Sequence, residues 1–446
     1  MEAAEPRETL SVLDAAGIVV GMVMGVGIFK TPSIVAASTE SEGILLLFWL
    51  AGGLVSLAGA LCYAELMCAF PHAGGDYHYL NRAFGFPPAF LYAWARLAVV
   101  QSGSIAMVAF LIGDYASEIF RLGAFSSSWY AALAVVLFTA VNIAGIRQGK
   151  WTQRLLASGI LFGLLAASAL GILAAGPRPP ASGGGIVSGG QALGTAMIFV
   201  LLTYGGWNEA SFLSAEVRKG RLNLLKVLLC SLVTVTGVYL LVNVALLKRL
   251  GLPAMAASGA VMADLMRSLL GPAAGVVVSL LILLAAASTM NASIITGART
   301  GYALGRDFPV LGMLGRWQEG RHTPVNALLV QGGVALALVA WGTGAHDGFV
   351  RMVEYTAPVF WLFFLMVGAS VFFLRRRYPD RPRPFRVPLY PLTPSVFIAV
   401  CIFMLWSSLV YTGLGSWVGV CVLLSGIPLL VLGKRRAADN REGGRP

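Results

Sequence analysis

Two glycine-rich segments of the sequence combine flexible backbone with polar residues, which makes them candidate ligand-binding segments. The first, residues 17–32, has the sequence GIVVGMVMGVGIFKTP, and the second, residues 204–211, has the sequence YGGWNEAS. Each glycine inside a helix costs about 1 kcal/mol relative to alanine. We therefore predict that both segments are unwound, which leaves backbone N–H and C=O groups without helical partners and able to bind a ligand.

The two predicted breaks offer opposite polarities to a ligand. The N–H groups that begin the half-helix after Gly25 suit a carboxylate, whereas carbonyl groups released near Gly205 suit an ammonium group. An α-amino acid carries both groups and satisfies both breaks. Glycines also allow helices to pack closely in small-xxx-small patterns, and this alternative stays open for Gly17 and Gly21.

Composition indicates which elements hold these segments. Apolar residues make up 57% of the 446 residues, charged residues make up 12%, and the mean hydropathy is +0.79. Soluble domains have roughly 45–50% apolar and about 25% charged residues, so an all-α polytopic membrane protein is predicted. A helix needs about 20 apolar residues to cross a bilayer. Twelve such spans are predicted, at residues 12–37, 43–69, 86–119, 127–146, 153–175, 192–215, 224–247, 271–298, 323–343, 350–374, 391–411 and 415–433.

The glycine-rich segments fall in spans 1 and 6. They occupy corresponding places in two five-span blocks, 12–175 and 192–374, and the separation of Gly25 from Gly205 matches the length of one block. Paired interruptions of this kind indicate a binding site at the membrane midplane between inverted repeats. We thus expect a single transmembrane domain, 1–446, in which spans 11 and 12, residues 391–433, follow the second repeat.

Basic residues gather in alternate loops and in both tails. This asymmetry predicts a multi-pass protein of the cytoplasmic (inner) cell membrane with both termini in the cytoplasm. The net charge of +12 then reflects the basic residues that orient the protein. Some of them, for example residues 375–377, are also expected to contact anionic lipid. No nucleic-acid partner is expected. The five cysteines lie in apolar stretches without metal-ligand spacing, so no metal, disulfide or cofactor is expected.

Three motifs resemble those of the amino acid–polyamine–organocation (APC) superfamily. They are GVGIFKTP in span 1, YAELMCAFPHAGGDYHYL after span 2, and YGGWNEASFLSAEVRKGRLNL across span 6. Within the superfamily the chain is most similar to bacterial amino acid permeases and L-type amino acid exchangers, over residues 11–434. The resemblance implies five-plus-five inverted repeats with broken helices 1 and 6, two additional C-terminal helices, and transport by alternating access.

The family's substrate site maps onto both breaks. Val26 stands where the family's carboxylate-binding motif has serine, which leaves the contact to backbone N–H groups. Leu202 stands where the exchangers have a phenylalanine gate, and Asn208 stands where basic-substrate exchangers have a glutamate. The residues carried over as substrate-binding are Val23, Gly25, Val26, Gly27, Ile28, Leu202, Thr203, Gly205, Trp207 and Asn208.

Energy coupling has two candidate sites in the sequence. Glu209 follows break 6 and is the candidate for carrying a proton, the alternative being a local ion pair, for example with Arg96. Many sodium-independent relatives have a lysine in span 5 in the place of a sodium ion, and here that position is Ile160. Oxygen-bearing residues of span 8 are weaker candidates for a cation site, the alternative being hydrogen bonds between helices; they are Ser288, Thr289, Asn291 and Ser293.

The function predicted from these features is secondary active transport of neutral amino acids, by proton-coupled symport or by exchange. Alternatives within the carrier class are a sodium-coupled symporter and a carrier of polyamines or cationic amino acids. The alternative from another class is a channel or sensor with a transporter fold. An enzyme is not expected, because the sequence offers no nucleophile–base pair or metal cluster at membrane depth. The sequence also has no Walker motif, so ATP-driven transport is not expected. The oligomeric state and any accessory subunit stay open.

Overall fold

The computed structural model describes residues 20, 23–72, 74–144, 150–174, 190–209, 222–308, 311–318, 323–345 and 347–432. These residues form a helical bundle whose only pairing of strand type is an isolated bridge between Gln318 and Thr323. Among the described residues, the five cysteines form no disulfide.

Nine helices in the described residues are long and apolar enough to cross a membrane, and they match nine of the predicted spans. Spans 1, 5 and 6 correspond to shorter or interrupted helices: η1 (Val26–Phe29) with α2 (Thr31–Ala37), α8 (Lys150–Leu173) and α9 (Gly190–Thr203). The predicted all-α polytopic class is therefore confirmed. Seven of the nine long helices are single elements: α3 (Glu42–Ala69), α7 (Ser126–Ile143), α10 (Leu222–Arg249), α13 (Pro272–Asp307), α14 (Val325–Thr343), α15 (Gly348–Arg377) and α16 (Leu392–Val410). The other two are Phe86–Ile119, which consists of α5 (Phe86–Ala95), η2 and α6 (Ser102–Ile119), and Leu414–Leu432, which begins with α17 (Leu414–Leu424).

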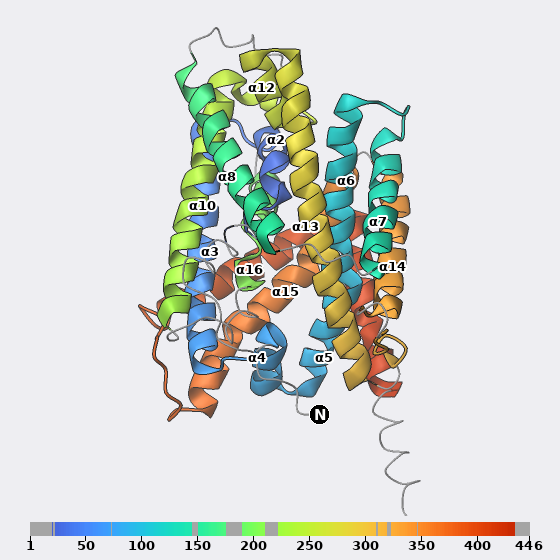
Figure 1. Ribbon diagram of the computed structural model, residues 1–446. Helices are drawn as coiled ribbons and strands as arrows, with labels where there is room; N and C mark the ends of the chain where they lie inside the picture. The colour runs from blue at the N-terminus through green and yellow to red at the C-terminus, as the bar shows by residue number, and fades with distance from the viewer. Residues whose placement is uncertain are drawn as a thin grey trace, which may run out of the picture.

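Corresponding helices of the two halves pack against one another (Figure 1). The α2 helix contacts α9, α3 contacts α10, α6 contacts α13, and α7 contacts α14. Inverted repeats related by a pseudo-twofold axis are expected to pair their helices in this way. The exact limits of the repeats, 12–175 and 192–374, and of the last two spans, 391–433, stay predictions.

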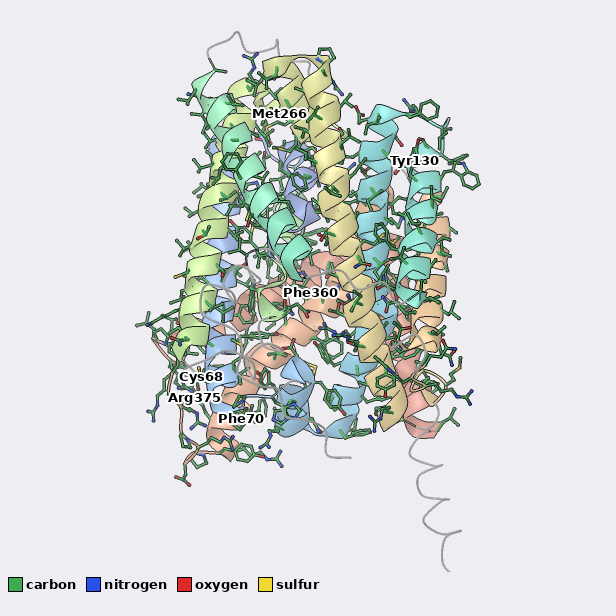
Figure 2. The ribbon with its side chains drawn as sticks, in the orientation of Figure 1. Cys68, Phe70, Tyr130, Met266, Phe360 and Arg375 are labelled. Atoms are coloured by element: carbon green, nitrogen blue, oxygen red, sulfur yellow. The ribbon has the colours of Figure 1, made fainter. Side chains whose placement is uncertain are left out.

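The two ends of the bundle carry different short helices. The amphipathic α4 helix (Gly75–Phe84) lies at the same end as Arg375, whereas α12 (Val261–Leu270) lies at the opposite end, as does Tyr130 (Figures 1 and 2). The arginines after α15 thus share one end with α4, as the alternation of basic loops predicts. We call these the α4 end and the α12 end.

The α12 end differs in detail from the sequence-based expectation. Residues 255–269 are predicted to form one short helix over the mouth of the protein. The structure instead has two helices, α11 (Gly251–Ala257) and α12, because the backbone at Ser258 is extended (φ −81°, ψ 129°) and stops the first helix.

An ion pair at the α4 end ties α3 to α15. Glu65 is 2% exposed, and its carboxylate accepts hydrogen bonds from Arg375 Nε (2.7 Å) and from the N–H of Val387 (2.7 Å). Arg383 Nε lies 3.6 Å from the same carboxylate. Buried charge is tolerated only when it is paired and hydrogen-bonded, and the loop after α15 supplies these partners.

We expect Glu65→Ala to destabilise the protein, because it leaves Arg375 and Arg383 beside a buried, vacated site. Removing one partner of a buried pair costs on the order of 3 kcal/mol, which lowers the midpoint of thermal unfolding measured by intrinsic fluorescence in detergent. Glu40→Ala is the control, since Glu40 is exposed. Equal midpoints for the two variants would contradict a structural role for Glu65.

Candidate functional site

Break 1, residues 24–30, interrupts span 1 where the glycines predict it. The Met24 N–H still donates to Val20 O (2.7 Å), but Gly25 is then extended (φ −70°, ψ −170°) and a 3₁₀ turn, η1, follows. The α2 helix begins at Thr31, with a proline in its first turn, where the missing proline N–H costs nothing. Gly17 and Gly21 lie outside the described residues.

Break 6, residues 204–209, follows the end of α9 at Thr203. The Gly205 N–H turns back to Leu202 O (3.0 Å), and Gly206 has a φ of 108°, which glycine adopts without steric cost. A 3₁₀ turn closes with the Glu209 N–H bonded to Gly206 O (3.1 Å). The predicted interruption of both helices is confirmed.

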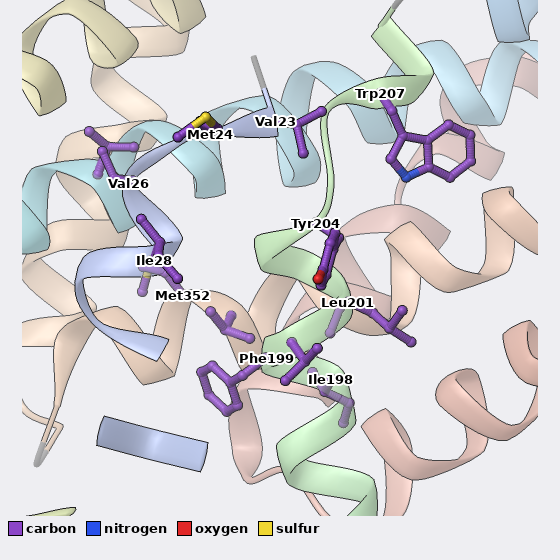
Figure 3. Packing of buried hydrophobic residues seen from close by; sticks show 14 of the residues in the cluster. Val23, Met24, Val26, Ile28, Ile198, Phe199, Leu201, Tyr204, Trp207 and Met352 are labelled. Carbon is purple, nitrogen blue, oxygen red and sulfur yellow. The ribbon is translucent and has the colours of Figure 1, made fainter. Parts of the chain in front are cut away.

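The two breaks touch each other. A Cβ atom added at Gly27 would lie 2.8 Å from Thr203 Oγ1, so glycine permits the close approach of η1 to α9. The hydroxyls of Thr31 and Thr203 are 2.7 Å apart and share a hydrogen bond. Figure 3 shows Val23 and Val26 of span 1 and Tyr204 of break 6 within this one region. Segments nearly half the chain apart therefore form one site.

Tyrosine hydroxyls from the surrounding helices hold the released carbonyl groups. Tyr239 of α10 donates to Val23 O (2.8 Å) and lies 3.3 Å from Thr203 O, so it bridges both breaks. Tyr115 of α6 donates to Phe29 O (2.9 Å). The sequence analysis did not single out these residues. The available signal was a tyrosine within an apolar span, whose hydroxyl needs a buried partner.

Glycines in the two breaks are partly accessible, whereas the apolar side chains of break 1 are buried. In break 1, Val26 and Ile28 are buried, whereas Gly25 and Gly27 are partly accessible. In break 6, Gly205 and Gly206 are partly accessible, as is Leu202 just before the break. A ligand at this site therefore meets mostly backbone, which agrees with the sequence expectation that Val26 leaves binding to N–H groups.

Trp207 and Asn208, two of the residues predicted to contact substrate, are buried, and their contact with substrate stays a prediction. Trp207 is 3% exposed, and its indole packs against Tyr63 (ring centroids 5.0 Å apart) and Phe364 (5.4 Å). Asn208 is 7% exposed. The Trp207 ring supports break 6 from the core side, a position that depends on α3 and α15 and is not visible in the local motif.

An aromatic ring that the sequence analysis did not single out faces break 6. Phe360 of α15 is partly accessible, lies 3.8 Å from the Cβ position of Gly205, and stacks on Phe364 (4.2 Å between centroids). Leu202 replaces the aromatic gate of the exchangers, so Phe360 supplies the nearby aromatic surface (Figure 2).

Lys30 closes the α12 end of the site. Its Nζ lies 2.8 Å from Asp114 Oδ2 and 3.1 Å from Asp347 Oδ2, and 3.5 Å from the carbonyl of Gly259 between α11 and α12. These contacts tie the start of α2 to α6 and α15. The motif GVGIFKTP contains Lys30, but only the fold brings the two aspartates to it.

Glu209 forms a bidentate ion pair with Arg96. Arg96 Nη1 donates to Glu209 Oε1 (3.0 Å) and Nη2 donates to Oε2 (2.8 Å). Arg96 opens the π-helical segment η2 (Arg96–Gln101), and such segments are frequent at functional sites. The local ion pair kept as the alternative for Glu209 is therefore present, and a direct role of Glu209 in proton transfer stays a prediction.

The candidate cation ligands of span 8 make hydrogen bonds within and between helices. Asn291 Oδ1 accepts from Asn142 Nδ2 of α7 (2.7 Å), and Thr289 Oγ1 donates to Ala285 O (3.1 Å). The Ser293 carbonyl accepts from Gln101 Nε2 (2.8 Å). These contacts match the alternative of interhelical bonding, and a sodium site at Ser288, Thr289, Asn291 and Ser293 stays a prediction. Among the described residues, no group of three His, Cys, Asp or Glu is arranged to hold a metal ion.

Comparison with known proteins agrees with this architecture. The family model described as amino acid permease matches residues 10–430. The chain is 30% identical to the b(0,+)-type amino acid transporter 1 of Mus musculus, over 91% of this chain and 83% of the relative. It is 28% identical to the large neutral amino acids transporter small subunit 2 of Mus musculus (96% and 81%). It is 26% identical to the serine/threonine exchanger SteT of Bacillus subtilis (97% and 98%).

The match to the family model includes both breaks and the helices that hold them. The predicted resemblance to the APC superfamily is confirmed, and the enzyme class is excluded because the relatives are transporters. This multi-pass membrane chain belongs to the amino acid permease family.

Proposed function

We propose that this protein is a secondary active carrier of neutral amino acids that works by alternating access. The observation that supports the proposal is the close approach of two unwound segments whose accessible positions are glycines, apart from Glu209 in break 6. Backbone N–H groups after Gly25 suit the carboxylate of an amino acid, and carbonyl groups at the end of α9 suit its ammonium group. The names of the relatives, all amino acid transporters or exchangers, support the same substrate class.

Neutral substrates follow from the charges near the breaks. Asn208 is uncharged, and Val26, Ile28 and Leu202 are apolar, so the nearest charged side chain on break 6 is Glu209. That carboxylate is already bound to Arg96, and a cationic side chain would have to displace a bidentate guanidinium. The printed names of two relatives, which specify large neutral amino acids and serine/threonine, favour the neutral class.

Alternating access requires the α12 end to open during the cycle. The Lys30 contacts with Asp114, Asp347 and Gly259 close that end, and they must break for α2 to move. We propose that the α4 end faces the cytoplasm of the cell membrane, with both termini on that side, since Arg375 in the last turn of α15 lies there. Proton coupling or exchange is favoured over sodium coupling, because the Asn291 side-chain oxygen already accepts a hydrogen bond from Asn142.

We expect proteoliposomes containing the purified protein to take up labelled neutral L-amino acids with saturable kinetics. A panel of alanine, serine, leucine, phenylalanine, arginine and the polyamine putrescine identifies the substrate class. Unlabelled substrate inside the vesicles is expected to stimulate uptake, because a carrier returns faster when loaded. Linear flux that does not saturate would indicate a channel, and preferential uptake of arginine or putrescine would contradict the neutral class.

We expect Gly27→Ala to abolish most transport while leaving the protein folded. The added methyl group would meet the Thr203 hydroxyl at 2.8 Å and push break 1 away from α9. A loss of about 1.4 kcal/mol in the contact between the breaks lowers substrate affinity about tenfold, measured by uptake at several substrate concentrations. Gly159→Ala in α8 is the matched control, since its methyl group meets nothing within 4 Å; equal losses in both variants would refute the role of Gly27.

A further inference from the structure

Asp76 is a buried carboxylate outside the substrate site. It lies in the first turn of α4, between spans 2 and 3, and is 2% exposed. Its Oδ2 accepts hydrogen bonds from the hydroxyls of Tyr63 in α3 (3.1 Å) and Tyr92 in α5 (3.2 Å). Buried carboxylates are rare unless they have a structural or chemical role.

A chain of hydrogen bonds connects Asp76 to break 6. Arg96 Nη1 donates to the Tyr92 hydroxyl (3.3 Å), and the same guanidinium holds Glu209 with both of its terminal nitrogens. The order of groups is therefore Asp76, Tyr92, Arg96 and Glu209. This network runs from the α4 end to the segment that binds substrate, and it contains two carboxylates and one guanidinium.

The groups around Asp76 favour its protonated form. Burial, the largest cause, and the negative charge of Glu209 together raise the pKa of Asp76 to about 7, with Arg96 and the hydroxyls of Tyr63 and Tyr92 partly offsetting both effects. The α15 helix, which packs on α4, contributes the apolar rings of Phe363 against Tyr92 and Phe364 against Tyr63. Within α4, Tyr79 is also buried.

Two histidines at α4 are the other titratable groups of this region. His72 and His78 stack with ring centroids 4.0 Å apart, and Arg82 Nε donates to His78 Nε2 (2.9 Å). Burial, together with its neighbours His72, Arg82 and Arg381, lowers the pKa of His78 to about 4, and burial also lowers that of His72. His78 is therefore neutral across the range in which Asp76 titrates.

We propose that Asp76 is the proton-binding site of this carrier and that the Glu209–Arg96 pair sets its affinity for the proton. This inference rests on the proposed function and extends it to the coupling ion. While Glu209 holds Arg96, the positive charge is shared with a carboxylate on break 6, and a proton stays on Asp76. When break 6 moves and Glu209 leaves, Arg96 is available to stabilise the Asp76 carboxylate, and the proton leaves.

Thermodynamic linkage couples proton binding at Asp76 to substrate binding at break 6. If substrate binding changes the position of break 6, it changes the proton affinity of Asp76, and the proton changes substrate affinity by the same factor. Glu209 then acts as the positioning residue and Asp76 as the group that binds the proton. The network needs no ion other than the proton.

The experiment is an infrared titration of the purified protein in lipid from about pH 5 to about pH 9, without substrate. The protonated carboxyl band of a buried group is expected to vanish with a midpoint near pH 7, and Asp76→Asn is expected to lack this band. Tyr63→Phe removes a donor to the ionised carboxylate and should move the midpoint up by about 1 pH unit. Glu209→Gln should move it down, because the opposing charge is removed and Arg96 is released.

His78→Gln is the control and is expected to leave the midpoint unchanged. A band that survives in Asp76→Asn, or a midpoint that moves with His78 and not with Tyr63 and Glu209, would overturn the proposal. Tyr63→Phe keeps the aromatic ring that packs on Trp207, so it provides a test even where Asp76→Asn fails to fold.

Transport supplies a second readout. Using the neutral amino acid with the highest uptake in the panel, accumulation driven by an inward proton gradient is expected in the parent protein and lost in Asp76→Asn. Accumulation that persists in this variant would overturn the proposal. The infrared midpoint does not depend on any substrate, so a carrier without amino acid uptake and a carrier without a proton site at Asp76 give different results.

Discussion

Unsatisfied backbone groups inside a membrane are the constraint on which the rest of this structure depends. Each one costs several kcal/mol in hydrocarbon, so a helix can break at membrane depth only where something else satisfies its N–H and C=O groups. Here breaks 1 and 6 meet through Gly27 and Thr203, and Tyr239 donates to a carbonyl of break 1 while lying within reach of one in break 6. The backbone groups at the accessible glycines are then available to bind a substrate.

Buried charged side chains likewise need partners, and three groups of them obtain these partners from neighbouring segments. Lys30 joins α2 to α6 and α15 at the α12 end, Arg96 joins break 6 to α5 near the middle, and Glu65 joins α3 to α15 at the α4 end. Such pairs stabilise one arrangement of the helices, because a movement of either helix separates the partners and leaves buried charges unpaired. The Lys30 and Arg96 contacts involve the segments next to the breaks, whereas the Glu65 contacts join continuous helices.

The fold was predictable because its signals are local. Twelve apolar stretches, the glycines at 25, 27, 205 and 206, and the alternation of basic loops are each visible within a few residues. The site was predictable only in part. Trp207 lies in a motif that suggests a substrate contact, yet Tyr63 and Phe364 take it into the core. Phe360 faces break 6 from span 10, which no pattern near it indicates.

Local sequence patterns do not show which charged residues form ion pairs, and Glu209 is the clearest example. Glu209 stands out in the sequence as an acidic residue after a break, but whether it carries a proton or an ion pair depends on Arg96, more than a hundred residues away. Sequence alone predicted a polytopic membrane protein with two broken helices, since apolar length and glycine placement act over single helical turns, and its three motifs indicated the amino acid permease family. Only the tertiary structure decided which polar groups meet, because ion pairs and hydrogen bonds form between helices and require atoms within about 3 Å.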